Sequence, residues 1–191
     1  MNLHTDIDID VADRTELLSI IPHVPAIQKD GNTVRKHNTG VYFHDMPTNP
    51  LTGNATIDYK MAQDLGYFKI DVLNVSLYKQ VKSPEHLDKL CEIEPDWSML
   101  TDPKIVSQLF HLGNHVDVTI SKAPKNINQL AMLLALIRPA KKHLIHLPWD
   151  QIEKSIWTKS EEDEEGYGYK KSHALGYSMA IVVQMNLLAD H

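Results

Sequence analysis

The sequence predicts an α+β fold in which one mixed sheet comes first and helices pack on it afterwards. Strand-like runs fall within the first 75 residues, and the remainder has mostly helical spacing. Hydrophobic residues make up 42% of the 191 residues, which is ordinary for a globular protein with a sizeable core. We expect residues 1–81 to form the sheet and residues 82–191 to form a helical region that packs on it, in a single compact domain.

The first part of the chain predicts three strands and two short helices. Residues 4–11 alternate between acidic and apolar side chains, as a strand does. Residues 12–21 have helical spacing and stop at Pro22, which cannot continue a helix. The segments that follow are expected to be a loop (23–33), a strand (40–45), a loop (46–54), a short helix ended by Gly66 (56–66) and a strand (67–75).

The second part predicts helices. The most apolar stretch, residues 174–188, is shorter than the roughly 20 residues of a membrane span and contains Gln184 and Asn186, so it is expected to be a buried helix. Residues 160–168, SEEDEEGYG, are expected to form a solvated loop. The expected helices are residues 84–91, 102–112, 126–137, 148–157 and 172–188.

Composition narrows the classes of function. The net charge of −6 argues against general electrostatic binding of nucleic acid, so any contact with nucleic acid should be local, metal-assisted or shared with a partner. The single cysteine, Cys91, excludes an internal disulfide, and no Cys/His pair has the spacing of zinc ligands. The N-terminus lacks the pattern of a signal peptide. We therefore expect a cytoplasmic protein that makes no use of a membrane.

Acidic residues at alternate positions of the first strand are the most informative feature. Asp6, Asp8 and Asp10 should project from one side of the strand, where like charges raise one another's pKa. If the strand that holds Asp71 is a neighbour, Asp8, Asp10 and Asp71 can converge as ligands for Mg²⁺ or Mn²⁺. Two such ions about 3.5–4 Å apart support phosphoryl transfer. The alternatives are a charged edge strand that prevents aggregation, and an ion pair between Asp71 and Lys69.

Six segments also resemble, in the same order, motifs of the bacterial replicative DNA polymerase III alpha subunit, the C family. Together these segments span most of residues 5–188. They are TDIDIDVADR (5–14), KHNTGVYFHDMP (36–47), IDYKMAQDLGYFKIDVLNVSLYKQV (57–81), VSQLFHLGN (106–114), LLALIRPAK (133–141) and GYGYKKSHALGYSMAIVVQMNLL (166–188).

The resemblance implies a nucleotidyltransferase-like palm, of the DNA polymerase beta-like type, with a two-ion site. Its catalytic metal ligands would be Asp8, Asp10 and Asp71, whereas Asp6 matches an acid that is not a ligand. The substrate-binding residues that it implies are Lys36, Lys69, Arg138, Lys171, Ser172 and His173.

Simpler roles for these side chains remain open from the residues alone. Arg138 could be a helix-ending residue, and Ser172 could cap the last helix beside His173. For His37, a structural role is favoured over a catalytic one.

The chain also departs from the family pattern. The family has a glycine-rich G-G-R-G-S loop before its first aspartates, a thumb and a large basic fingers region. Here residues 11–35 have room for one helix and a loop, and residues 141–165 offer Lys141 and Lys142 followed by an acidic run. We therefore expect a second protein chain to supply the missing parts for binding DNA and nucleoside triphosphate.

Three functions remain open at this point. The first is a minimal or split polymerase palm that performs metal-dependent nucleotidyl transfer. The second is a catalytically inactive palm that acts as a protein- or DNA-binding scaffold in a replication or DNA-modification complex. The third is a phosphodiesterase that uses the same ions with water as the nucleophile. A bacterial or phage-infected cell would be the expected setting.

Overall fold

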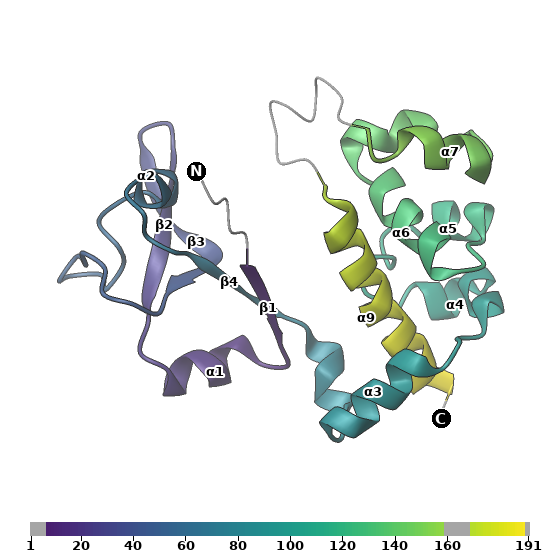
Figure 1. Cartoon of the computed structure of the whole chain (residues 1–191), viewed down its shortest axis with the longest axis horizontal. Coiled ribbons are helices and arrows are strands. Elements are labelled where there is room, and N and C mark those ends of the chain that lie inside the picture. The colour runs from purple at the N-terminus through teal and green to yellow at the C-terminus, as the bar shows by residue number, and fades with distance from the viewer. Residues whose placement is uncertain (1–6, 159–168, 190–191) are drawn as a thin grey trace. The chain divides into compact units, whose positions relative to one another are not determined.

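The computed structural model describes residues 7–158 and 169–189 and has an α+β architecture, with a small mixed sheet and packed helices (Figure 1). The chain divides into two compact units, Met1–Gln80 and Val81–His191. We call them the sheet unit and the helical unit and describe each by itself.

Four strands form the sheet in the order β1-β4-β3-β2, so that β1 and β2 are its edges. β1 pairs in parallel with β4, whereas β4 with β3 and β3 with β2 are antiparallel. The strands are β1 (Ile7–Val11), β2 (Val24–Asp30), β3 (Thr33–Tyr42) and β4 (Ile70–Asn74). The small mixed sheet is thus as predicted, while Asp6 lies outside the described residues.

The predicted loop at residues 23–33 is wrong, because this segment forms β2 and the turn into β3. Asp30 and Gly31 begin a hairpin turn, and Gly31 has a φ of 58°, which favours glycine. β2 accommodates Pro25 because it is an edge strand whose pairing shifts register between Pro25 and Ile27, where proline is tolerated. β3 consequently begins at Thr33 instead of Gly40.

Two short helices complete the sheet unit. α1 (Arg14–Ile20) begins at Asp13, whose carboxylate accepts hydrogen bonds from the backbone N–H groups of Thr15 and Glu16. α2 (Tyr59–Asp64) is followed by Gly66 at a φ of 87°, as the sequence predicted. A 3₁₀ turn, η1 (Ser76–Gln80), ends the unit. One buried hydrophobic cluster of the unit comprises Ala26, Tyr42, Met46, Ala55 and Ala62.

The helical unit contains six α-helices and two 3₁₀ turns within its described residues. Four of the predicted helices are confirmed, but the one expected at residues 102–112 is a short helix that ends at Val106. It is followed by turns, in which His111 adopts a left-handed φ of 59°. α5 was not predicted. The elements are α3 (Pro84–Glu92), η2 (Trp97–Thr101), α4 (Pro103–Val106), α5 (Val116–Lys122), α6 (Ile127–Leu136), η3 (Pro139–Leu144), α7 (Trp149–Ser155) and α9 (Lys171–Ala189).

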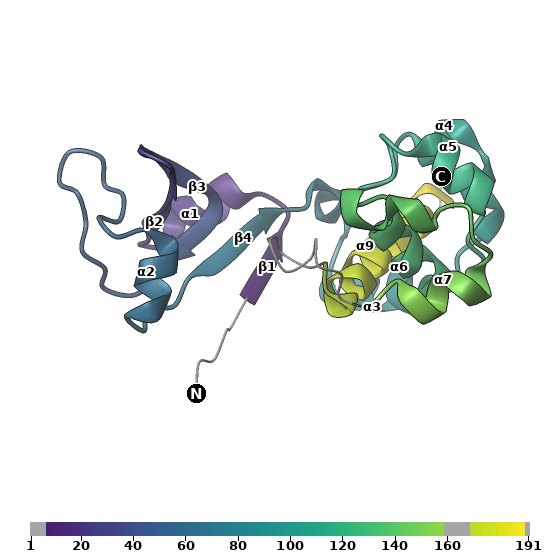
Figure 2. The same cartoon turned by 90° about the horizontal axis from the view of Figure 1, so that it is seen from above.

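α6 and α9 run side by side through the helical unit (Figures 1 and 2). Residues 130–136 of α6 are all buried, which is the pattern of a helix surrounded by protein. The two polar residues noted in the last helix hold other segments in place. Gln184 accepts a hydrogen bond from the Phe110 N–H (2.8 Å), and the Asn186 amide donates to the carbonyls of Leu90 and Ile93 at 2.8 and 2.9 Å.

Over residues 7–158 and 169–189, the structure contains no helix with the length and apolar character needed to cross a membrane.

Two glycines provide a matched test of these backbone conformations. Gly66→Ala should lower the free energy of unfolding by about 1 kcal/mol, because a side chain is strained at its positive φ. Gly176 lies inside α9 with no atom within 4 Å of the added Cβ, so Gly176→Ala should instead raise it by about 0.5–1 kcal/mol. Urea unfolding of both variants measures the difference, and equal effects would contradict the assigned conformations.

Candidate functional site

The parallel pairing of β1 with β4 brings the predicted aspartates to one face of the sheet. Asp8 is the register partner of Asp71, and Asp10 pairs with Leu73. Register partners and alternate residues of a strand point to the same face. Adjacent strands lie about 4.8 Å apart and alternate residues about 6.6 Å apart, so Asp8, Asp10 and Asp71 are near neighbours. We call this surface the aspartate face.

Asp71 is engaged by two side chains of its own unit. The Lys69 ammonium forms an ion pair with Asp71 Oδ2, and Thr39 Oγ1 donates to Asp71 Oδ1 at 2.7 Å. The side chains of Lys69 and Asp71 are only 18% and 14% exposed, so each depends on the other for charge compensation. The ion pair that the sequence left open as an alternative is therefore present.

A bulge in β3 explains how Thr39 reaches this carboxylate. Between the pairs Ile27–Lys36 and Pro25–Val41, β2 advances two residues and β3 five. The extra residues fold around His37, whose Nδ1 accepts the N–H groups of Gly40 (2.9 Å) and Thr39 (3.3 Å). The bulge thus re-aims a side chain that regular alternation would have placed elsewhere.

The bulge also makes His37 a structural acceptor. Partial burial lowers the pKa of His37, and the nearby positive charge of Lys69 lowers it further, against the opposing effect of Asp71. A neutral ring leaves Nδ1 free to accept the two N–H groups. The 3.7 Å approach of His37 Nδ1 to Asp71 is therefore not an ion pair at neutral pH. This agrees with the structural role favoured for His37.

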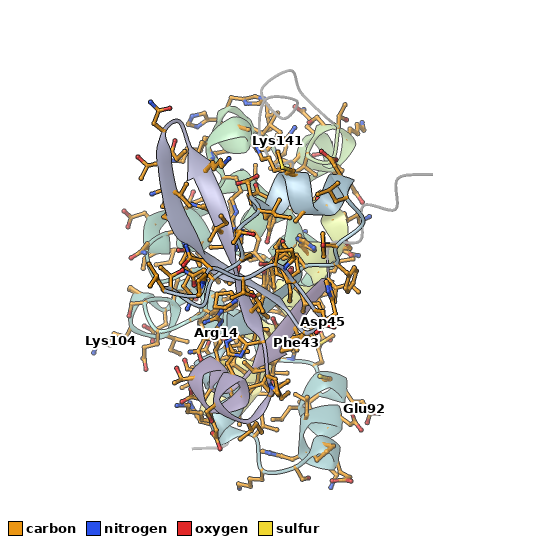
Figure 3. The ribbon with its side chains drawn as sticks, turned by 90° about the vertical axis from the view of Figure 1, so that its left-hand side faces the viewer. Arg14, Phe43, Asp45, Glu92, Lys104 and Lys141 are labelled. Atoms are coloured by element: carbon orange, nitrogen blue, oxygen red, sulfur yellow. The ribbon has the colours of Figure 1, made fainter. Side chains whose placement is uncertain are left out.

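Gly40 and Arg14 complete the surroundings of Asp71. A Cβ on Gly40 would lie 2.7 Å from Lys69 Cδ and 3.0 Å from His37 Nδ1, so glycine at this position leaves room for the Lys69 side chain. Arg14, labelled in Figure 3, donates from Nε to the Val72 carbonyl (3.1 Å) and from Nη2 to the Thr39 carbonyl (3.3 Å). It joins β4 to the bulge.

The sequence analysis missed Thr39, Gly40 and Arg14 as members of this site. The first two could have been found only by predicting the antiparallel pairing of the segment after Lys36 with the strand that holds Asp71, which sets Gly40 opposite Asp71. Arg14 carried no signal of its own, because its partners are backbone carbonyls.

Asp10 is exposed, and its pKa is raised by partial burial of the carboxyl and by the negative charge of Asp8. Carboxylate oxygens are the ligands that Mg²⁺ and Mn²⁺ prefer, so the donor chemistry fits. The geometry fits less well, since a cation at Asp71 would have to displace Lys69. In the described part of the chain, no three His, Cys, Asp or Glu side chains are grouped to hold a metal ion.

Of the other predicted substrate-binding residues, Lys36 belongs to the sheet unit, whereas Arg138, Lys171, Ser172 and His173 belong to the helical unit. Lys36 is an exposed residue of β3. Arg138 precedes η3, and its guanidinium lies 4.5 Å from the centre of the Tyr169 ring. Lys171, Ser172 and His173 are in the first turn of α9, with the Lys171 ammonium 5.9 Å from the Trp157 ring. Tyr169 thus connects Arg138 with the beginning of α9.

Replacing Asp10 tests the electrostatics of the aspartate face. A raised pKa means that the contribution of Asp10 to stability is present below its ordinary pKa of 3.8 and is lost as the pH rises through the folded-state value. Asp10→Asn should therefore raise the free energy of unfolding at pH 7, by less than about 1 kcal/mol because the side chain is exposed.

The increase in the free energy of unfolding should disappear as the pH falls below 3.8. Asp45→Asn, at an exposed position of the same unit, provides the matched control (Figure 3). Chemical unfolding at several pH values measures both. An Asp10→Asn effect equal to that of Asp45→Asn at every pH would refute the repulsion.

Comparison of the chain with known protein families, with curated proteins and with solved structures gave no match. The functional assignment accordingly depends on the geometry of the described residues and on the motif resemblance of the sequence.

Proposed function

We propose that the aspartate face binds a divalent cation, Mg²⁺ or Mn²⁺, and serves metal-dependent nucleotidyl transfer on nucleic acid as a reduced C-family polymerase palm. The observation that carries this proposal is the β1–β4 register, which sets Asp8 beside Asp71 with Asp10 on the same face. Lys69 supplies one positive charge at Asp71, and a divalent cation would supply two to the three neighbouring carboxylates.

The residues of the site would have different roles in metal binding, phosphate contact and orientation of the carboxylate. Asp8, Asp10 and Asp71 would hold the metal ions, and these ions would supply positive charge to the attacking and leaving oxygens of a phosphoryl displacement. Lys69 would neutralise Asp71 in the metal-free protein and, once displaced, contact a substrate phosphate. Thr39 would keep the Asp71 carboxylate in one orientation through its 2.7 Å hydrogen bond.

The proposal includes a second protein chain. Binding a nucleoside triphosphate and DNA takes several cationic or backbone donors, and this chain has a net charge of −6. The partner would provide the glycine-rich loop and the basic fingers and thumb surfaces that the family uses for these substrates. The motif resemblance also predicts contacts with the substrate by Lys36, Arg138, Lys171, Ser172 and His173.

A scaffold role is the second candidate, and one observation favours it. Both carboxylate oxygens of Asp71 already have partners, Lys69 and Thr39, so the site is partly satisfied without a cation. In a scaffold, the Lys69–Asp71 pair would be a permanent structural element, and the aspartate face would have no metal to hold.

Replacing Lys69 separates these two roles. Lys69→Met leaves Asp71 largely buried and unpaired, so it should lower the free energy of unfolding by about 3–5 kcal/mol without metal. If a cation competes with Lys69, the variant should bind Mn²⁺ more tightly than the wild type. Mn²⁺ at 100 times its dissociation constant should then restore about 2.7 kcal/mol. Titration followed by electron paramagnetic resonance gives the affinity, and chemical unfolding with and without Mn²⁺ gives the stability.

Two further variants control this experiment. Lys29→Met removes an exposed lysine from β2 of the same unit and should change neither quantity. Asp8→Asn combined with Asp71→Asn should abolish Mn²⁺ binding. Failure of Mn²⁺ to bind or stabilise Lys69→Met would reject the metal site and leave the scaffold role.

Catalysis is tested with the partner present. A pull-down should recover a chain that bears the G-G-R-G-S motif, and primer extension should require both chains and Mg²⁺. Asp8→Asn should reduce extension by at least about 100-fold, since a metal ligand stabilises the transition state. No extension in any mixture, or extension that is insensitive to Asp8→Asn, would contradict the proposed activity.

A further inference from the structure

A polar pocket of about 370 Å³ lies in the helical unit, beside the segment between α4 and α5. This volume is within the usual range for sites that take small molecules. None of the described residues that line the pocket is acidic, and the polar ones are Ser107, His111, Asn114, His115 and Arg138. We call it the Arg138 pocket.

Two nitrogen atoms of the lining residues are buried without a partner. Arg138 Nε and His111 Nε2 form no hydrogen bond with any described residue. Leaving a buried donor unsatisfied costs about 1–3 kcal/mol, and more when the group is charged. Both nitrogen atoms are closed to solvent, so a ligand in the pocket would be bound by the other donor positions of these two side chains.

Arg138 is held in place without being neutralised. Its guanidinium lies 4.5 Å from the centre of the Tyr169 ring, which orients the planar group. Within residues 7–158 and 169–189, no carboxylate lies within 4.0 Å of it. A fixed guanidinium with free donor positions is suited to planar or tetrahedral oxyanions.

His111 is held by an unusual backbone conformation. Its φ of 59° is rare for a residue with a side chain, and it persists because the surroundings fix it. The ring packs against Phe110 and Tyr177, with centroids 4.1 and 4.7 Å away. Gln184 secures the preceding backbone, since its amide donates to the Gln108 carbonyl and its oxygen accepts the Phe110 N–H, both at 2.8 Å.

The segment between α4 and α5 is also closely packed at Gly113. A Cβ added to Gly113 would lie 2.7 Å from the Ser107 carbonyl oxygen, so this position needs glycine. Burial and the positive charge of Arg138 lower the pKa of His111 to about 4, so its ring is neutral at pH 7 and can donate one N–H. The pocket therefore combines one permanent cation with several neutral donors.

From this geometry we propose that the Arg138 pocket binds the phosphate group of a small molecule, with Arg138 and His111 as its principal ligands. A phosphate accepts hydrogen bonds from several directions, which matches a guanidinium, an imidazole, an amide and a hydroxyl around one space. The limited volume and the net charge of −6 favour a small phosphate ester over a nucleic-acid strand. The proposed function also counts Arg138 among its predicted substrate contacts, but binding at the Arg138 pocket does not need a metal at the aspartate face.

The test is calorimetric titration of the full chain with inorganic phosphate and with adenosine monophosphate. Wild-type protein should bind at least one of them in the millimolar range or tighter. Arg138→Gln should weaken binding at least tenfold and His111→Gln several-fold, whereas Lys142→Gln, which removes the same charge from an exposed position of η3, should leave it unchanged. Arg138→Lys keeps the charge but loses the planar fork, so it should fall between Arg138→Gln and the wild type.

Circular dichroism establishes that each variant is folded before titration. No binding up to about 10 mM of either probe, or equal weakening by Arg138→Gln and Lys142→Gln, would overturn the proposal. Binding of a single-stranded oligonucleotide with the same dependence on Arg138, in the absence of binding to either small probe, would overturn it in favour of a nucleic-acid site.

Discussion

The parallel pairing of β1 with β4 is the constraint on which the sheet unit depends. β1 has five residues and lies at the sheet edge, so β4 is its partner within the sheet. Ile7 and Ile9 remain 42% and 38% exposed, and burial alone would specify the register weakly. Arg14 adds to the backbone ladder at the end of β1, since its side chain donates to the Val72 carbonyl and its N–H donates to the Asn74 side chain.

The bulge in β3 turns this register into a chemically defined site. His37 accepts the N–H groups of the bulge and thereby aims Thr39 at Asp71, while Gly40 leaves space for Lys69. Asp71 is therefore oriented from one side and neutralised from the other. Such a carboxylate can either keep its lysine as a fixed partner or exchange it for a cation, and the choice between these states distinguishes a scaffold from a metal site.

In the helical unit, polar side chains of α9 hold neighbouring segments in place through hydrogen bonds to their backbone. Its apolar helix α6 packs against α9, and Gln184 and Asn186 of α9 hold the segments around Phe110 and the end of α3. This arrangement supports the strained backbone at His111 and leaves the Arg138 guanidinium without an acidic neighbour among the described residues. The unit thus has a fixed positive charge where the sheet unit has clustered negative ones.

The sequence by itself determined the mixed sheet, most helices and the shared face of Asp8 and Asp10, because alternation, proline, glycine and helical spacing act over a few residues. It could not determine the β2–β3 hairpin, whose edge strand β2 contains Pro25, or the left-handed backbone at His111. Only the tertiary structure placed Asp71 beside Asp8, gave it Lys69 and Thr39 as partners, and formed the Arg138 pocket. These features depend on contacts between residues far apart in the chain, and local propensity carries no information about such contacts.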